Sequence, residues 1–338
     1  MTSIVCEISV KMVEIGNYNE LFMLKIYTLF RNVDESILKL NKYIKGYQFV
    51  KFDLLEVKDR FSNLFNMPNS FTSEEYFVNY TGQELDRYFC DAINWSKLSD
   101  SGFFNRYYMI FLETIDYDVK VKIDGKEYFA GDTNSVLYVT HEYVKHLTQC
   151  LRLTFPGYTV ATVTFLINLS SKEIPIRFYG SGSRHEEKTL CINESKFEQF
   201  NNLIQNKLPI SNDLLLTLEY FNASYTVEYD MVRFIILITA LESIFSISHD
   251  QITHTVARHS SLLLSNTKEE FQNNYSKIKK LYNQRSNFIH GTKDKIVLLE
   301  EDIDFTEELV RKAIIFWINL GQNKQQLFNY FNRLGYSA

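Results

Sequence analysis

The pattern of apolar and polar positions divides the chain into two parts. Residues 1 to about 205 mix segments typical of strands with longer helical segments. We expect strands over residues 106–129, 158–169 and 174–179, and helices over residues 73–95, 141–153 and 194–208. Within the first strand segment, Asp124 and Gly125 predict a hairpin turn. The first part is therefore predicted to be a mixed α+β domain.

The strand pattern stops near residue 212, and helical periodicity continues from there. We expect helices over residues 213–221, 228–246, 253–264, 268–290, 306–320 and 324–334. The second of these is apolar almost all round, which is typical of a helix at the centre of a bundle. Pro209 lies near the junction. The sequence thus predicts an α+β fold, with a mixed N-terminal domain over residues 1–210 and an all-α bundle over residues 211–338.

The composition excludes several classes of protein. Of the 338 residues, 45% are hydrophobic and 23% are charged, which is typical of a globular chain. The net charge of −5 excludes a protein that coats nucleic acid by bulk charge, although a local basic site is compatible with it. The cysteines form no Cys-x-x-Cys pair, so they indicate neither a disulfide framework nor a thiolate zinc site.

We expect a soluble, cytoplasmic protein without a cofactor. The first residues carry no basic segment before an apolar core, so they are unlike a secretory signal. The most apolar stretch, residues 231–245, is interrupted by Arg233 and Glu242 and is shorter than the ~20 residues that a membrane-spanning helix needs. The Gly-Ser-Gly-Ser segment at residues 180–183 is neither a phosphate-binding loop nor a nucleophile elbow.

A local excess of positive charge lies on the longest predicted helix and just after it. Between residues 277 and 295 the only acidic residue is Asp294, and the basic residues are Lys277, Lys279, Lys280, Arg285, Lys293 and Lys295. The resulting net charge of +5 favours an anion-binding patch on an otherwise acidic chain. The structural alternative is a solvated helix face.

Arg285 and His290 stand five residues apart at the end of this helix, where Gly291 is expected as its C-terminal cap. An arginine can hold a phosphate through its forked donors, and a histidine can move the proton of a 2′-hydroxyl or a leaving oxygen. At ~100° per residue, however, the two side chains point about 140° apart around a regular helix. Either the helix end bends His290 back, or the motifs of two copies meet.

Glu242 lies in the apolar helix over residues 228–246. A carboxylate in such a helix is costly unless it is paired. Arg285 and Arg258 are its candidate partners, and we therefore expect Glu242 to be buried and bound to one of them.

The order of these motifs resembles that of the Apea-like HEPN domains, which are helical bundles of phage-defence and abortive-infection proteins. The resemblance covers about residues 213–334 and rests on Ala240-Leu241-Glu242, on Ala257-Arg258, and on Tyr282-x-x-Arg285-Ser286-x-x-Ile289-His290-Gly291. It implies a HEPN-like bundle and a metal-independent endoribonuclease of antiviral defence. It also implies that two R-x4-H motifs form one composite site at a homodimer interface.

The resemblance assigns roles to individual residues. Arg285 and His290 match the catalytic pair, and Glu242 matches an acidic helix position that supports the site. Residues expected to contact RNA are Ser286, Asn287, Lys279, Lys280, Lys293 and Arg258. The implied partners are RNA, a second copy of the chain bound through the C-terminal bundle, and a phage-derived trigger or a regulatory protein.

Three alternatives stay open at this point. The bundle could be a catalytically silent dimerisation or adaptor module, or it could bind a nucleotide through Arg285 and the lysines. A metal site is a third possibility, because His141, His146 and Cys150 fall on one predicted helix. No further ligand cluster accompanies them, and we therefore expect no metal.

Overall fold

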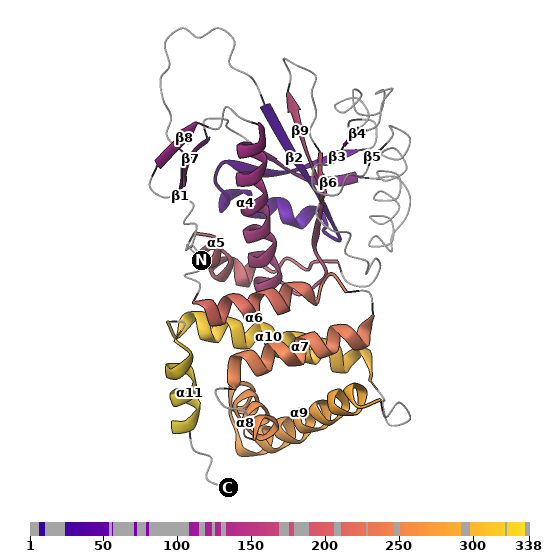
Figure 1. Ribbon diagram of the computed structural model, residues 1–338, viewed down its shortest axis with the longest axis vertical. Coiled ribbons are helices and arrows are strands. Elements are labelled where there is room, and N and C mark those ends of the chain that lie inside the picture. The colour runs from indigo at the N-terminus through magenta and orange to yellow at the C-terminus, as the bar shows by residue number, and fades with distance from the viewer. Residues whose placement is uncertain are drawn as a thin grey trace. The chain divides into compact units, whose positions relative to one another are not determined.

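The computed structural model describes most of the chain, which forms two compact units (Figure 1). The described residues are 7–10, 24–53, 56, 71–72, 79–80, 108–114, 119–123, 126–129, 133–168, 176–178, 189–205, 211–227, 229–246, 251–291, 298–321 and 323–334. One unit comprises Met1–Ser181 with His185–Gln205, and the other comprises Gly182–Arg184 with Asn206–Ala338. The change after Gln205 lies close to the boundary expected at residue 210.

The N-terminal unit is built on an antiparallel sheet with the strand order β10-β9-β2-β6-β3. Its strands are β2 (Leu24–Arg31), β3 (Tyr47–Asp53), β6 (Tyr108–Thr114), β9 (Val160–Asn168) and β10 (Ile176–Phe178). The short helix η1 (Glu35–Lys42) contacts β3, and α4 (Thr133–Thr154) packs against β9 and against α5 (Phe197–Gln205), which follows η2 (Glu194–Lys196). The mixed α+β character of this unit is confirmed.

Several of its elements differ from the sequence-based expectation. The strands β7 (Val119–Ile123) and β8 (Lys126–Phe129) pair antiparallel, and β7 also pairs with β1 (Glu7–Val10), in a separate sheet from β6. The expected turn residues between them, Asp124 and Gly125, lie outside the described residues. Of the helix expected over residues 73–95, only residues 79–80 are described. They form the strand β5 (Asn79–Tyr80), which pairs with β4 (Phe71–Thr72), so the helix prediction was wrong there. The strands β2 and β3 were not predicted.

Every secondary-structure element that the structure describes in the C-terminal unit is a helix, as predicted. It contains α6 (Asn212–Ala223), α7 (Asp230–Phe245), α8 (Ile252–Leu264), α9 (Lys268–Ile289), α10 (Glu300–Asn319) and α11 (Lys324–Arg333). Helix α7 contacts every other helix described in this unit, which confirms its central position (Figure 1). Helix α10 begins at Glu300 rather than at residue 306, because three acidic residues in its first turn suit the positive end of a helix dipole.

None of the described helices combines the length and the hydropathy needed to cross a bilayer.

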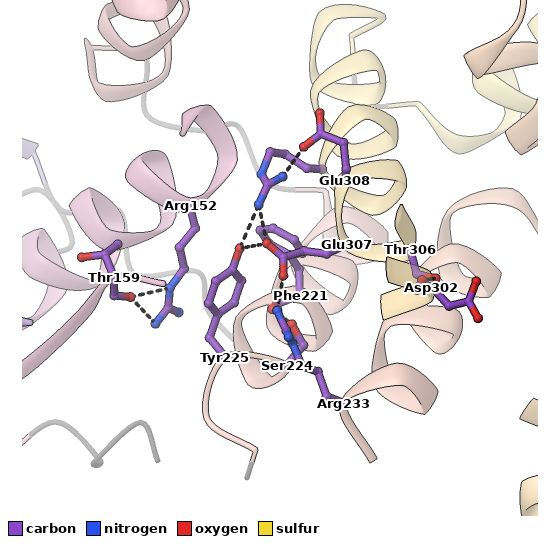
Figure 2. Close-up of polar contacts among 11 residues, drawn as sticks. Arg152, Thr159, Phe221, Ser224, Tyr225, Arg233, Asp302, Thr306, Glu307 and Glu308 are labelled. Atoms are coloured by element: carbon purple, nitrogen blue, oxygen red, sulfur yellow. Dashed lines mark hydrogen bonds and ion pairs between the residues drawn. The ribbon is translucent and has the colours of Figure 1, made fainter. Parts of the chain in front are cut away.

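A buried ionic cluster joins α7, α10 and the segment after α6 (Figure 2). The Glu307 carboxylate accepts hydrogen bonds from Arg233, from Arg311 and from the Tyr225 hydroxyl, the last at 2.7 Å. Arg311 also donates to Tyr225 at 3.1 Å and to Glu308 on the rim of the cluster. Tyr225 is fully buried and the other members of the central group are at most 7% exposed. Removing one charged member therefore leaves a buried charge without its partner.

We expect Glu307→Ala to lower the free energy of unfolding of the C-terminal unit by about 3–5 kcal/mol, because two buried guanidinium groups lose their shared carboxylate. The chain has two tryptophans, Trp95 and Trp317. In a Trp95→Phe background, the fluorescence of Trp317, which is fully buried in α10, measures the urea-induced unfolding of this unit. The matched control is Glu308→Ala, whose half-exposed carboxylate should contribute less than about 1 kcal/mol. Equal losses for the two variants would contradict this account.

Candidate functional site

Helix α9 carries the Arg285 and His290 motif and has well-defined ends. At its start, Thr267 and Glu270 form a reciprocal capping box. At its end, the backbone N–H of His290 bonds to the carbonyl oxygen of Ser286 at 3.0 Å, and Gly291 has a φ of +73°. This is the left-handed conformation that favours glycine after a helix, so the expected glycine cap is confirmed. His290 is therefore the last residue with an α-helical (i to i−4) hydrogen bond, and the N–H of Gly291 bonds to the carbonyl oxygen of Phe288 at 3.1 Å.

Glu242 on α7 has two partners on α9. One carboxylate oxygen accepts a hydrogen bond from the Tyr282 hydroxyl. The other lies 3.6 Å from Nη2 of Arg285, which is an ion pair without a direct hydrogen bond. Tyr282 is 7% exposed, and its burial together with the adjacent carboxylate raises the pKa of its phenol. The expected pairing of Glu242 with Arg285 is therefore present, although Glu242 is half-buried and not fully enclosed.

Arg285 keeps most of its hydrogen-bonding capacity. Its side chain is 27% exposed, and its Cζ lies 5.9 Å from the centre of the Tyr282 ring. Within the described part of the chain, no hydrogen bond reaches its guanidinium, and its buried Nε has no acceptor. The five N–H groups of the guanidinium therefore make no hydrogen bond to a described residue, and the Glu242 carboxylate balances its positive charge across 3.6 Å. Such a group can bind a phosphate oxygen without first breaking a hydrogen bond.

His290 lies on a different side of the helix from Arg285. Its side chain is exposed, whereas Arg285 faces Glu242 on α7. The 3.0 Å hydrogen bond from His290 to Ser286 continues the helical pattern, so the helix end does not bend His290 back. The separation of about 140° expected from the spacing therefore applies to the folded chain. A single copy does not bring the two side chains to one phosphate.

The residues expected to contact RNA differ in their surroundings. Lys279 and Lys280 are exposed on α9, and Ser286 and Asn287 are half-buried on it. Lys293 lies outside the described residues. Lys277, from the same basic run, places its ammonium 3.9 Å from the centre of the Phe305 ring on α10.

Arg258 does not join the site. It donates to the backbone carbonyl oxygens of Phe331 and Leu334, at 3.1 and 2.9 Å, and so binds the C-terminal end of α11. The expectations that it pairs with Glu242 or contacts RNA find no support in this position. These two hydrogen bonds engage two of the five N–H donors of its guanidinium.

The neighbouring residue, His259, is a buried side chain of α8 that packs against α11. Its ring stacks on Phe331 at 5.3 Å between ring centres and meets the edges or faces of Phe245 and Phe328. Its Nε2 lies 3.3 Å from Oδ1 of Asn332. The side chain is 1% exposed, and burial is the main cause that lowers its pKa to about 4. We therefore assign His259 to the packing of the bundle.

The histidines and cysteine considered for a metal do not assemble a site. Cys150 is fully buried on α4, with its Sγ 3.7 Å from Nε2 of His146, and burial raises the pKa of the thiol. Among the described residues, no group of three or more histidine, cysteine, aspartate or glutamate side chains is placed to hold a metal ion.

Comparison with known proteins adds no relative. No protein-family model, curated protein or solved structure matches the chain. The function of this chain therefore has to be inferred from its own residues, on α7 and α9.

Tyr282 belongs to the sequence motif, but its hydrogen bond to Glu242 was not predicted, because only Arg285 and Arg258 were considered as partners of that carboxylate. The available signal was its spacing of three residues from Arg285, which puts the two side chains on neighbouring positions of one helix face.

We expect Glu242→Ala to destabilise the C-terminal unit by about 1–3 kcal/mol, because the buried Tyr282 hydroxyl loses its acceptor and Arg285 loses its counter-charge. Glu242→Gln keeps an acceptor for Tyr282 and should cost less. Urea unfolding followed through Trp317 separates these two contributions. Wild-type stability in Glu242→Ala would show that the contacts are energetically neutral.

We expect the stability of this unit to fall as the pH drops from about 7.5 to 5, by about 2 kcal/mol from His259. The lowered pKa means that the unfolded chain binds a proton in this range while the folded chain does not. The contribution is present above pH 6.5 and is lost toward pH 4. Comparing urea unfolding of wild type and His259→Phe at both pH values isolates this term, and identical pH dependence in the two proteins would refute it.

Proposed function

We propose that the C-terminal unit is a metal-independent, HEPN-type endoribonuclease that acts in antiviral, abortive-infection defence as a homodimer. The observation that carries the proposal is the state of Arg285. Its guanidinium is held near Glu242 and Tyr282, yet it is partly exposed and makes no hydrogen bond to any described residue. The exposed His290 lies one and a half turns further along α9. A phosphate-binding cation and a proton-transferring side chain are what RNA cleavage requires.

In the proposed reaction, the 2′-oxygen of one nucleotide attacks the adjacent phosphorus atom, and the bond from phosphorus to the 5′-oxygen of the next nucleotide breaks. Neutral His290 takes the proton of the 2′-hydroxyl, and a protonated His290 of the partner subunit gives a proton to the leaving oxygen. Arg285 holds the phosphate oxygens on which charge accumulates. The products are a 2′,3′-cyclic phosphate and a free 5′-hydroxyl.

The separation of Arg285 and His290 around α9 supports a dimeric site. Because one copy does not direct both side chains to the same phosphate, a second copy has to supply the missing group. A twofold axis places the same surface of both chains in contact, so two Arg285 and two His290 side chains would share one cleft.

A second candidate is a catalytically silent dimerisation or adaptor module. The observation that favours it is the ion pair between Arg285 and Glu242, which already balances the charge of the guanidinium. Under this alternative, the chain dimerises and does not cleave RNA.

We expect the purified full-length protein to cleave mixed RNA in EDTA and to leave 2′,3′-cyclic phosphate ends. His290→Ala and Arg285→Ala should each lower the rate by at least about 100-fold, since general acid–base catalysis contributes about 10²–10⁴. The matched control is His254→Ala, an exposed histidine of α8 that bonds to Tyr275 and should leave the rate unchanged. Dependence on a divalent ion, or full activity in His290→Ala, would contradict the mechanism.

Mixing the two inactive variants tests the composite site. A heterodimer of Arg285→Ala and His290→Ala chains carries one intact arginine and one of the two proton-transferring histidines, so its activity should exceed that of the His290→Ala homodimer and stay below that of the wild type. A site complete within one chain predicts no recovery. Sedimentation of the full-length protein should show the mass of two 39.9 kDa chains. An inactive dimer would favour the adaptor module, and a strict monomer would contradict both candidates.

A further inference from the structure

The two oxygens of the Glu242 carboxylate meet different partners. One oxygen accepts the hydrogen bond of the Tyr282 hydroxyl, and the other lies 3.6 Å from Nη2 of Arg285. Tyr282 and Arg285 are three residues apart on α9, so they approach the carboxylate from neighbouring positions of one helix. Among the described residues, the carboxylate is therefore hydrogen-bonded to the tyrosine and only close to the arginine.

The gap between Glu242 and Arg285 needs a physical cause. A guanidinium and a carboxylate in contact usually form short, charge-assisted hydrogen bonds, often two in parallel. The observed distance exceeds a hydrogen bond by roughly half an ångström. The two side chains are only 20% and 27% exposed, so their attraction is stronger than it would be between fully solvated groups. Two parallel bonds need both oxygens of the carboxylate, and Tyr282 occupies one of them.

The opposing demands of Arg285 and Tyr282 on this carboxylate are visible in their surroundings. The buried Nε of Arg285 has no acceptor in the described part of the chain, which is a costly state that favours drawing an acceptor closer. The Tyr282 ring is 7% exposed and is thus fixed by the packing of the bundle. Its burial and the adjacent carboxylate raise the pKa of the phenol, so the hydroxyl keeps its proton and remains a donor at neutral pH and well above it.

We propose that Tyr282 is a positioning residue, which keeps Arg285 open to a phosphate by holding the Glu242 carboxylate away from it. The site then has two arrangements. In the open one, which this structure shows, the guanidinium is free to bind phosphate oxygens. In the closed one, the carboxylate turns both oxygens to the guanidinium and occupies its donors. The proposal rests on the proposed ribonuclease function only for the identity of the phosphate, as part of RNA.

The alternative role of Tyr282 is core packing alone. In that case, replacing it with phenylalanine removes one hydrogen bond and changes nothing at Arg285. If the tyrosine positions the carboxylate, the same replacement moves Glu242 onto Arg285 and converts a loose ion pair into a hydrogen-bonded one. The two roles therefore differ in what the substitution does to the arginine, and not in how much stability the substitution costs.

A double-mutant cycle on unfolding separates the two roles without RNA. In the Trp95→Phe background, the fluorescence of Trp317 follows urea unfolding of Arg285→Gln, once with Tyr282 intact and once with Tyr282→Phe. With the tyrosine intact, Arg285→Gln should lower the folding equilibrium constant by less than about fivefold, because the pair is partly exposed and not hydrogen-bonded. In Tyr282→Phe, the loss should be at least about tenfold, because a hydrogen-bonded pair is now broken.

The matched control for this cycle is Lys312→Gln, which removes an exposed positive charge from α10. Its effect should be the same with and without the tyrosine hydroxyl. Equal effects of Arg285→Gln in the two backgrounds would overturn the proposal. The same holds if the effect of Lys312→Gln grows as much as that of Arg285→Gln, because the bundle is then loosened as a whole.

Cleavage of mixed RNA in EDTA tests the consequence for the site. Tyr282→Phe should lower kcat/KM by about tenfold, because Arg285 loses donors to Glu242. Adding Glu242→Gln should raise kcat/KM again by at least about threefold, since a neutral amide attracts the guanidinium less. A tyrosine that only packs predicts no such recovery, and its absence in a protein that cleaves RNA would contradict the positioning role. If the wild type cleaves no RNA, the ribonuclease proposal fails, and the unfolding cycle alone decides the role of Tyr282.

Discussion

The buried carboxylate of Glu307 determines how the helices of the C-terminal unit are held. It binds Arg233 of α7, Arg311 of its own helix and the Tyr225 hydroxyl just after α6, all shielded from water. Because an unpaired charge is so costly in this environment, these segments cannot slide past one another independently. Glu242 lies nine residues after Arg233 on the same rigid helix, so its position depends on the cluster. The position of Glu242 in turn determines what Tyr282 and Arg285 contact.

Helix α9 combines two kinds of chemistry on opposite sides. On its inner side, Tyr282 and Arg285 meet the carboxylate of α7 in a partly shielded environment, where charge interactions are strong. On its outer side, His290 stands in solvent at the end of a polar face. Contacts with α7 therefore restrain Arg285, whereas the position of His290 is set by the backbone at the end of α9. The two members of one sequence motif thus depend on different physical constraints.

Much of the helical unit could be predicted from the sequence, because amphipathic periodicity and capping residues are local signals. The central place of α7 followed from its apolar surface, and the end of α9 followed from Gly291. The α+β class was also predicted correctly. The strands β2 and β3 were missed although Asn32 and Gly46 adopt positive φ at the end of β2 and the start of β3, because both become strands through pairing with β6, far along the chain.

The contacts of the candidate site were only partly predictable. The cost of a lone carboxylate pointed to a partner for Glu242, and Arg285 is that partner. The hydroxyl of Tyr282 was missed because an aromatic residue on an apolar stripe indicates core packing and says nothing of its polar end. The contacts of Arg258 were not predicted, because its carbonyl partners at the end of α11 lie more than seventy residues away along the chain. Periodicity holds no information on such distant pairs.

The left-handed Gly291 has a consequence for how this protein can vary in length. It ends α9 directly after His290, so the angular phase of the histidine depends on the number of residues before it. A one-residue insertion between Lys279 and His290 would turn the histidine by about 100° away from the lysine, and a seven-residue insertion would nearly restore the alignment. Natural variants that keep this face intact should therefore change the length of α9 by whole heptads.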